Sequence, residues 1–303
     1  MGKKSRRRPP VSARAEGAPV AVVGGREACP CGSGKRYRLC HGRAERENAT
    51  RLVARPFAGL AGECDWIALR EIVPAATATV TTTAQHGAAA ITVATVLPMA
   101  LPAMRRQDGS VILGLQTAGG SGDPSRDAAA ALLRALAAEP GTPVPEGDLV
   151  GSGPRLQEVL DTAQPFEVTV HPGFDFWLHP DQEVGPDLRE SMERANATVT
   201  PTARLTSVEA AYWFRINDRC HLRWVLPHDE AAVLDALARL HAAGASSILD
   251  GGRYVGSFRA DGVLVPVWDL PITTEAAELE EPAKEFAARL EEAMASSAPL
   301  TVP

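Results

Sequence analysis

Three cysteines and one histidine lie within thirteen residues near the start of the chain, as Cys29, Cys31, Cys40 and His41. Zinc binds four sulfur or nitrogen ligands at the corners of a tetrahedron, and three thiolates with one imidazole are a common structural set. Because the four ligands are local in sequence, a bound ion would fix the fold of this segment, and its loss would unfold it. The pattern therefore predicts a small zinc knuckle with these four side chains as ligands.

The residues between the ligands agree with this prediction. Gly32–Gly34 allow a tight backbone turn behind the first ligand pair. The connecting loop carries three basic residues that favour metal-binding thiolates, Lys35, Arg36 and Arg38. The alternative is a disulfide, but Cys29 and Cys31 are poorly placed to pair, and Cys40 would lack an obvious partner. The ligand types and their spacing favour zinc.

The segment from Cys29 to Gly42 resembles, almost letter for letter, the SEC-C motif that ends SecA-type preprotein translocase ATPases. The resemblance covers about a twentieth of the chain, and it implies that Cys29, Cys31, Cys40 and His41 take the four ligand positions. In SecA the motif is a docking point for the SecB chaperone and is linked to ribosome and membrane contact. SEC-C motifs are attached to many unrelated proteins, and nothing resembling the SecA motor is present here. The motif therefore implies zinc binding and leaves the activity open.

The rest of the chain resembles an uncharacterised actinobacterial family that carries an N-terminal SEC-C motif followed by a domain of unknown function. The resemblance runs from about Gly24 to Met294 and is clearest in four segments, Arg55–Thr77, Ile91–Gln116, Leu240–Ser247 and Val255–Pro271. It implies a fold and a bacterial origin, and it supplies no activity and no catalytic residues. The rarity of lysine among the basic residues also indicates a GC-rich bacterial genome.

Charge is distributed unevenly along the chain. Residues 1–55 carry 14 basic and 4 acidic side chains, a net charge of +10, whereas residues 56–303 carry 17 basic and 33 acidic ones, a net charge of −16. This asymmetry predicts a basic arm joined to an acidic domain. The arm either binds ribosomal RNA, DNA or another polyanion through phosphate contacts, or is a solvated tail that can fold back on the acidic domain. The candidate polyanion-binding residues are Lys3, Lys4, Arg6, Arg7, Arg8, Lys35, Arg36 and Arg38.

No segment has the character of a signal peptide or a membrane span. The basic residues at the N-terminus are followed by Pro9, Pro10 and further charges rather than by an apolar run. The longest stretch without charged residues, Ile72–Met104, is rich in threonine and contains three prolines. We therefore expect a cytoplasmic protein, in which Cys64 and Cys220 are buried thiols.

The chain is expected to comprise four parts in sequence: a disordered basic tail over residues 1–26, the SEC-C motif over 27–45, an α+β domain over 56–272, and a C-terminal helix over 273–296. A polar helical connector is expected between the motif and the domain, over residues 43–55. Adjacent strands interrupted by helices favour mainly antiparallel sheets with packed helices over a doubly wound fold.

Hydrophobic periodicity and turn residues predict the main elements of the domain. Strands are expected at Ile91–Val96, Val111–Leu115, Phe166–Val170 and Phe174–Leu178, and hairpins at Tyr212–Leu226 and Tyr254–Trp268. Helices are expected after Asp123, Pro186, Asp229 and Pro282. The helix after Asp229 is expected to bury a stripe formed by Val233, Leu234, Leu237, Leu240 and His241.

Four further features of the sequence could form binding sites. The loop Gly119–Asp123 precedes a helix and could hold a phosphate, but it lacks the P-loop lysine, so a plain capped loop is favoured; Gly151–Gly153 is similar. His171, Asp175 and His179 could form a second metal site, although solvent-facing strand residues are the simpler interpretation. The five tryptophans are expected in the core, and the sequence around Tyr212 and Trp213, with Arg215 and Arg223, could instead form a base-stacking platform.

Two functions from different classes follow. The first is a non-enzymatic zinc-binding adaptor whose basic arm and knuckle dock to the ribosome, nucleic acid or a protein partner. The second is an enzyme of unknown substrate that uses SEC-C as a targeting tag. The absence of a recognisable nucleophile, phosphate-binding or redox motif favours the adaptor.

Overall fold

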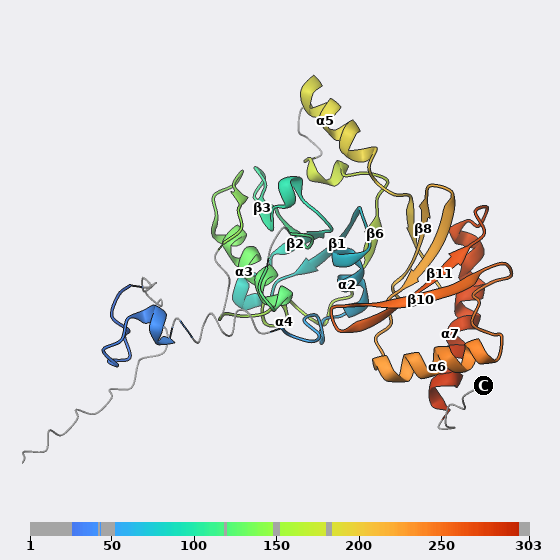
Figure 1. Ribbon diagram of the computed structural model, residues 1–303. Helices are drawn as coiled ribbons and strands as arrows, with labels where there is room; N and C mark the ends of the chain where they lie inside the picture. The colour runs from blue at the N-terminus through green and yellow to red at the C-terminus, as the bar shows by residue number, and fades with distance from the viewer. Residues whose placement is uncertain are drawn as a thin grey trace, which may run out of the picture. The chain divides into compact units, whose positions relative to one another are not determined.

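The computed structural model of the protein describes residues 26–41, 43, 52–117, 120–147, 152–179 and 184–296 (Figure 1). The chain divides into two compact units, Met1–Arg46 and Glu47–Pro303, here called the knuckle unit and the main unit. The expected basic tail, apart from Arg26, and most of the expected connector lie outside the described residues.

The first sheet of the main unit has six strands in the order β5-β3-β4-β2-β1-β6. Its strands are β1 (Ala76–Thr81), β2 (Ala90–Ala94), β3 (Ala103–Arg105), β4 (Val111–Gly114), β5 (Pro143–Val144) and β6 (Val168–Val170). Neighbouring strands are antiparallel except β2 and β4, which pair in parallel from Ile91↔Val111 to Ala94↔Gly114. The strands predicted over Ile91–Val96 and Val111–Leu115 are thus confirmed in the centre of this sheet, although β2 ends at Ala94. The Ile, Val and Leu side chains of β2 and β4 are buried.

Helix α3 (Pro124–Ala137) packs on this sheet beside β3, β4 and the short helix α4 (Leu156–Val159). Asp123 accepts a hydrogen bond from the backbone N–H of Arg126, and Pro124 occupies the first helical position, as the sequence predicts. Buried residues follow at helical spacing, with Ala129, Leu132 and Ala135 facing the core.

The second sheet has five strands, all antiparallel, in the order β10-β11-β9-β8-β7. Its strands are β7 (Thr202–Arg204), β8 (Ala211–Ile216), β9 (Arg219–Trp224), β10 (Arg253–Ala260) and β11 (Val263–Leu270). Both predicted hairpins are confirmed, and their turns place Asn217 and Asp261 at positive φ, a conformation that Asn and Asp tolerate better than most residues. Helices α6 (Glu230–Ala242) and α7 (Glu280–Ala295) pack together on one face of the sheet (Figure 1).

Helix α2 (Glu63–Glu71) joins the two sheets into one core. Its buried face, which includes Trp66 and Leu69, belongs to the same cluster as Val93 of the first sheet and Phe214 and Val265 of the second. Figure 1 shows α2 between the strands of the two sheets. The main unit therefore has an α+β fold with mainly antiparallel sheets, which confirms the predicted class.

Helix α5 (Pro186–Asn196) and the 3-10 helix Asp175–Trp177 form a satellite cluster. The strand predicted over Phe174–Leu178 is wrong. Phe174 instead stacks on Trp177, with 4.4 Å between the ring centroids, and contacts the buried Met192 of α5. Alternation of aromatic and polar residues imitated a strand, while Pro172 and Gly173 immediately before it favour a turn.

Two smaller expectations need correction, and one is confirmed. The stripe of α6 buries Val233, Ala236, Leu237 and Leu240, whereas Leu234 and His241 are exposed. The C-terminal helix begins at Glu280, two residues before Pro282, and buries Phe286 and Leu290 as expected. The remaining 3-10 turns are Tyr37–Leu39, Ala84–His86, Pro98–Ala100 and Ala276–Leu279. Among the described residues, no helix combines the length and the apolar character needed to cross a membrane.

Candidate metal centre

Backbone hydrogen bonds bring the two sides of the knuckle together, independently of the four ligand side chains. The backbone N–H of Cys29 donates to the carbonyl of Lys35 over 2.9 Å, and the N–H of Tyr37 donates to the carbonyl of Glu27 over 2.7 Å. Gly32 and Gly34 adopt φ values of 75° and 70°, which only glycine reaches without strain. These turns return the chain to its start, and a 3-10 turn at Tyr37–Leu39 then leads into the second ligand pair.

All four predicted ligands meet in one place. One ligand atom from each of Cys29, Cys31, Cys40 and His41 lies within 4.8 Å of every other. The Sγ of Cys31 is 3.5 Å from that of Cys29 and 3.6 Å from that of Cys40. The Nδ1 of His41 is 3.1 Å from the Sγ of Cys29 and 3.7 Å from that of Cys40. This is the one such group of Cys, His, Asp or Glu side chains among the residues described.

These separations can be compared with the edges of a zinc tetrahedron. Metal–sulfur and metal–nitrogen distances of about 2.3 and 2.0 Å place two sulfurs about 3.8 Å apart, and a sulfur and a nitrogen about 3.5 Å apart. Four of the six edges measure 3.1 to 3.7 Å, within about 0.4 Å of these values, and the other two are at most 4.8 Å. The group can therefore hold an ion of this size with small movements of the ligands, and the imidazole presents Nδ1 to it.

Hydrogen bonds within the knuckle prepare two of the thiols for metal binding. The backbone of Cys31, the largest effect, lowers the pKa of the Cys29 thiol. The Ser33 hydroxyl does the same for the pKa of Cys31. Ser33 also donates to Cys40 over 3.4 Å, but Cys31, burial and Cys29 together outweigh this bond and raise the pKa of Cys40. Three crowded sulfurs repel each other as thiolates, and a divalent cation would remove that repulsion.

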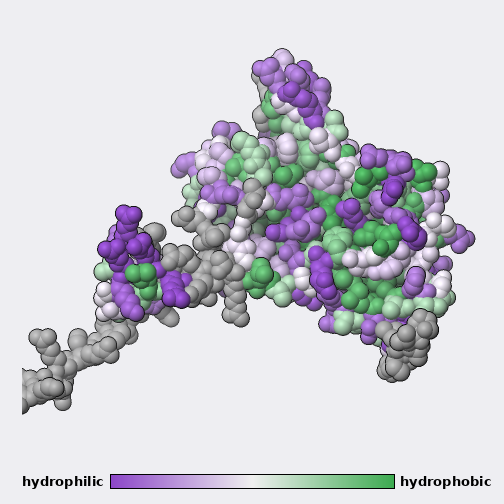
Figure 2. All heavy atoms as spheres, in the orientation of Figure 1, coloured by the Kyte–Doolittle hydropathy of each residue, from purple (hydrophilic) through white to green (hydrophobic). Residues whose placement is uncertain are grey.

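The outer surface of the knuckle is basic. Lys35, Arg36 and Arg38 are all exposed, and Leu39 beside them has 60 % of its surface exposed. Figure 2 shows the described knuckle residues as mostly hydrophilic. The other candidate polyanion-binding residues, Lys3, Lys4, Arg6, Arg7 and Arg8, lie outside the described part of the chain.

The two remaining cysteines are buried in the main unit, as predicted. Burial, the main cause, raises the pKa of the Cys64 thiol to about 12, so this thiol stays protonated and is a poor ligand or nucleophile. The Sγ of Cys220 lies 3.4 Å from the carbonyl of Ile272. Both thiols are structural.

The hypothetical second metal site is not formed. His171 Nε2 lies 2.8 Å from the Thr77 hydroxyl, and Asp175 accepts a hydrogen bond from Asn196. His179 instead forms an ion pair with Asp108 over 3.0 Å. Because a 3-10 helix replaces the strand predicted over Phe174–Leu178, the three side chains take three different partners.

The glycine-rich loop before α3 is a capped loop, as favoured. The backbone N–H of Ser121 donates to Asp127, and Asp123 pairs with both Arg126 and Arg155. Carboxylates thus occupy positions that a phosphate would need. Gly119 and Gly151 lie outside the described residues.

The aromatic residues are core residues rather than a stacking platform. Tyr212, Trp213, Trp66, Trp224 and Trp268 are all buried, and Trp177 is stacked on Phe174. Arg215 lies over Trp213 and pairs with Glu275. Tyr212 and Trp213 are therefore packed inside the protein and are not exposed for stacking on bases.

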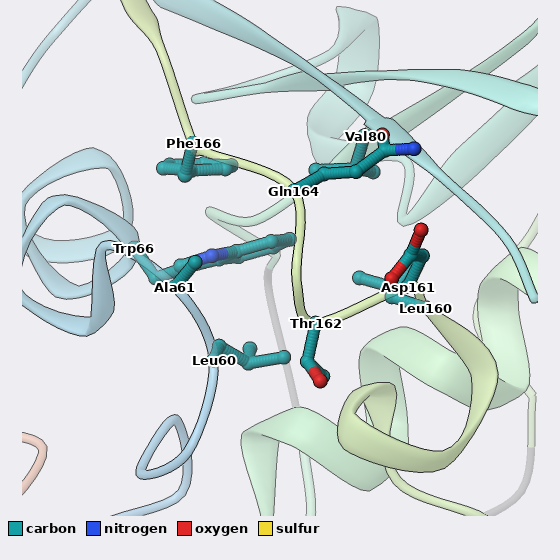
Figure 3. A pocket seen from close by; sticks show the side chains of 9 residues that line it. All are labelled: Leu60, Ala61, Trp66, Val80, Leu160, Asp161, Thr162, Gln164 and Phe166. Atoms are coloured by element: carbon teal, nitrogen blue, oxygen red, sulfur yellow. The ribbon is translucent and has the colours of Figure 1, made fainter.

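One hollow opens beside Trp66, lined by Leu60, Ala61, Val80, Leu160, Asp161, Thr162, Gln164 and Phe166 (Figure 3). Trp66 stacks on Phe166 with 4.3 Å between the ring centroids and forms one wall. The hollow has ≈ 10 Å³ of space for the centre of a water-sized molecule, which is about enough for a single water molecule. It is therefore a small hollow at the surface above the core and not a ligand pocket.

Sequence reasoning missed one polar cluster. Arg204 of β7 forms two hydrogen bonds with the carboxylate of Asp65 on α2, and the Tyr212 hydroxyl donates to the same carboxylate over 2.5 Å. The Arg204 guanidinium and the Tyr212 hydroxyl are far from Asp65 in sequence, so no local spacing could reveal the cluster. It links α2 to the second sheet.

Comparisons with known proteins divide the chain in the same way. The model of the family of unknown function DUF5926 matches residues 56–303, and the SEC-C motif matches residues 26–43. No curated protein and no solved structure is significantly similar to the chain.

Proposed function

The chain belongs to the family of unknown function DUF5926 and carries a SEC-C motif, and from this premise we propose that it is a zinc-binding adaptor. In this proposal the knuckle binds one zinc ion through Cys29, Cys31, Cys40 and His41. The knuckle and the basic arm before it then dock the acidic main unit to a polyanion, namely ribosomal RNA.

The observation that carries the zinc proposal is the convergence of four ligand atoms within 4.8 Å. Sulfur and imidazole ligands suit zinc, whereas calcium and magnesium prefer oxygen ligands. All four positions are filled by protein atoms, which is typical of structural zinc and leaves no open position for catalysis. The zinc ion therefore has a structural role, which is to fix the loop that carries the basic residues.

The charges of the chain support docking through the knuckle. Lys35, Arg36 and Arg38 project from the loop that the metal holds, and residues 1–55 carry a net charge of +10. The main unit, with a net charge of −16 over residues 56–303, would repel a nucleic acid. Because the arm and the knuckle attract a polyanion whereas the main unit repels it, we expect binding through the arm and the knuckle alone.

Cosedimentation of the full-length protein with ribosomes tests this proposal. If about five phosphate contacts form, binding should weaken by about 100-fold between about 50 and 200 mM salt, as counterion release requires. The double variant Lys35→Glu, Arg36→Glu should bind more weakly, and deletion of residues 1–45 should abolish binding. Arg194→Glu, an exposed charge reversal on α5, is the matched control and should bind like the natural protein. Binding that is insensitive to salt, or that survives the deletion, would contradict the docking role.

A further inference from the structure

One face of the second sheet carries a group of polar side chains that shares no residue with the metal centre. Residues two apart on a strand share a face, so His221 and Arg223 of β9 lie on the same side. Their cross-strand partners on β8 are Phe214 and Tyr212, and Asp269 of β11 lies opposite His221. The other face of the sheet packs against α6 and α7, so this group lies on the face away from those helices.

Arg223 is half-buried, and no described residue forms a hydrogen bond or an ion pair with it. Its one specific contact is with Phe214, where the guanidinium carbon lies 4.9 Å from the ring centroid. Burial lowers the pKa of the Arg223 guanidinium, since water is removed and no acidic side chain compensates.

The other partly buried arginines of the main unit are paired. Arg204 binds Asp65, Arg55 binds Glu63 and Arg155 binds Asp123, while Arg105 donates to two backbone carbonyls. A cation that is partly removed from water is costly unless an acceptor compensates it. Arg223 departs from this pattern in a unit with an excess of carboxylates.

The neighbouring histidine is held in a defined orientation. His221 Nδ1 lies 2.9 Å from one oxygen of Asp269, and Arg253 pairs with the other oxygen over 3.2 Å. Asp269 is therefore engaged by His221 and Arg253, and Nε2 is the ring nitrogen of His221 that remains for a ligand.

The contact of Arg223 with Phe214 shows in which direction its side chain extends. The Arg223 guanidinium lies over Phe214, and Phe214 is the cross-strand neighbour of His221. Arg223 is thus directed along the sheet toward the imidazole rather than away from it. A planar guanidinium with five N–H donors beside an oriented imidazole matches an oxyanion, which can accept two parallel hydrogen bonds.

We propose that Arg223 and His221 form a binding site for the phosphate or carboxylate group of a small molecule. The acidic main unit favours a small ligand over a nucleic acid, because electrostatic repulsion grows with the number of charges on the ligand. The site uses no residue of the knuckle, so its test is independent of the test of the docking role.

Nuclear magnetic resonance of the arginine side chains in the full-length protein tests the site directly. Inorganic phosphate and acetate are titrated separately at constant ionic strength while the Nε–H signals are followed. The Arg223 signal, identified by its absence in Arg223→Met, should shift and saturate with at least one anion. The anion that binds more tightly, phosphate or acetate, shows whether the natural ligand group is a phosphate or a carboxylate.

Three variants make the test specific. Arg223→Lys keeps the charge but loses the paired donors, so the anion should bind about tenfold more weakly. His221→Gln should also weaken binding while leaving Arg223 in place. Arg219→Met removes the same charge from the exposed end of β9 and should bind normally. Shifts that do not saturate, or that are equal in all arginine signals, would overturn the proposal.

Discussion

At the scale of single residues, the Asp65 side chain links α2 to the second sheet of the main unit. It has 4 % of its surface exposed and binds Arg204 and Tyr212, two residues of the second sheet. Burial, the main cause, and the adjacent Asp65 carboxylate raise the pKa of Tyr212 well above its usual value, although Arg204 opposes them, so the tyrosine stays protonated. The loss of one member leaves the hydrogen-bonding groups of the others unsatisfied, at a cost that depends on the charge of the group left behind.

Removal of single members of this cluster should therefore have graded effects. Asp65→Ala leaves a partly buried guanidinium without its partner and should lower the free energy of unfolding by about 3–5 kcal/mol. Tyr212→Phe removes one hydrogen bond and should cost about 1–2 kcal/mol. Arg194→Ala, which breaks an exposed pair with Glu190, is the control and should change stability by less than about 0.5 kcal/mol. Urea unfolding measures all three, and equal effects of Asp65→Ala and Arg194→Ala would contradict the assignment.

Asp261 at the β10–β11 turn should make stability depend on pH in the opposite direction to most carboxylates. Burial raises its pKa, although Arg70 lies 3.7 Å from its Oδ2. The folded state therefore binds a proton more readily than the unfolded state, and the contribution of this group to stability falls as pH rises through the folded pKa.

Asp261→Asn should accordingly increase stability at pH 7, and the gain should shrink as pH falls toward 4. Asparagine tolerates the positive φ of 42° at this position, so the turn is kept. Urea unfolding of both proteins at several pH values gives the difference. A gain that does not vary with pH would show that the charge of Asp261 is not its cause.

At the scale of elements, the same hairpin depends on a close backbone approach. A Cβ at Gly262 would lie 1.8 Å from the carbonyl oxygen of Ala54, and Gly262 has a φ of 83°. Gly262→Ala should thus be destabilised by about 2–4 kcal/mol, through both strain and a clash. Gly244→Ala, at φ 70° with open space, should lose only about 1 kcal/mol, and Gly185→Ala should lose almost none. Thermal unfolding of the three variants should follow this order, and a Gly262→Ala protein as stable as Gly185→Ala would refute the contact.

The elements that the sequence predicted are those with local signals. Asp123 and Pro124 mark the start of α3, and the turns at Asn217 and Asp261 mark the two hairpins. The parallel pairing of β2 with β4 and the position of α2 between the sheets depend on contacts between distant segments, which periodicity cannot report. The error at Phe174–Leu178 has the same origin, because packing against α5 outweighed an alternating pattern.

The two candidate sites also differ in whether local sequence or contacts between distant segments form them. The knuckle ligands lie within one short segment, so spacing alone predicted the cluster that the structure contains. The sequence pointed to Arg223 only as part of a possible stacking platform, and the pairing of His221 with Asp269 arises only from the register of β9 against β11.

At the scale of the whole molecule, the stability of the main unit should not depend on metal binding by the knuckle. All four ligands belong to the knuckle unit, Met1–Arg46, which is compact by itself. Removal of the metal with a chelator should therefore unfold the knuckle and shift the melting temperature of the main unit by less than about 1 °C. Scanning calorimetry with and without chelator measures this, and a large shift of the main transition would show that the units are energetically coupled.

The central claim, that this segment is a zinc site, is tested most directly by elemental analysis of the purified full-length protein. The account predicts close to one zinc per chain, with Cys29→Ser losing most of it because one of four ligands is removed. Cys220→Ala, which removes a buried thiol of the main unit, should keep its zinc. A natural protein without zinc, or a Cys29→Ser variant that retains all of it, would contradict the account.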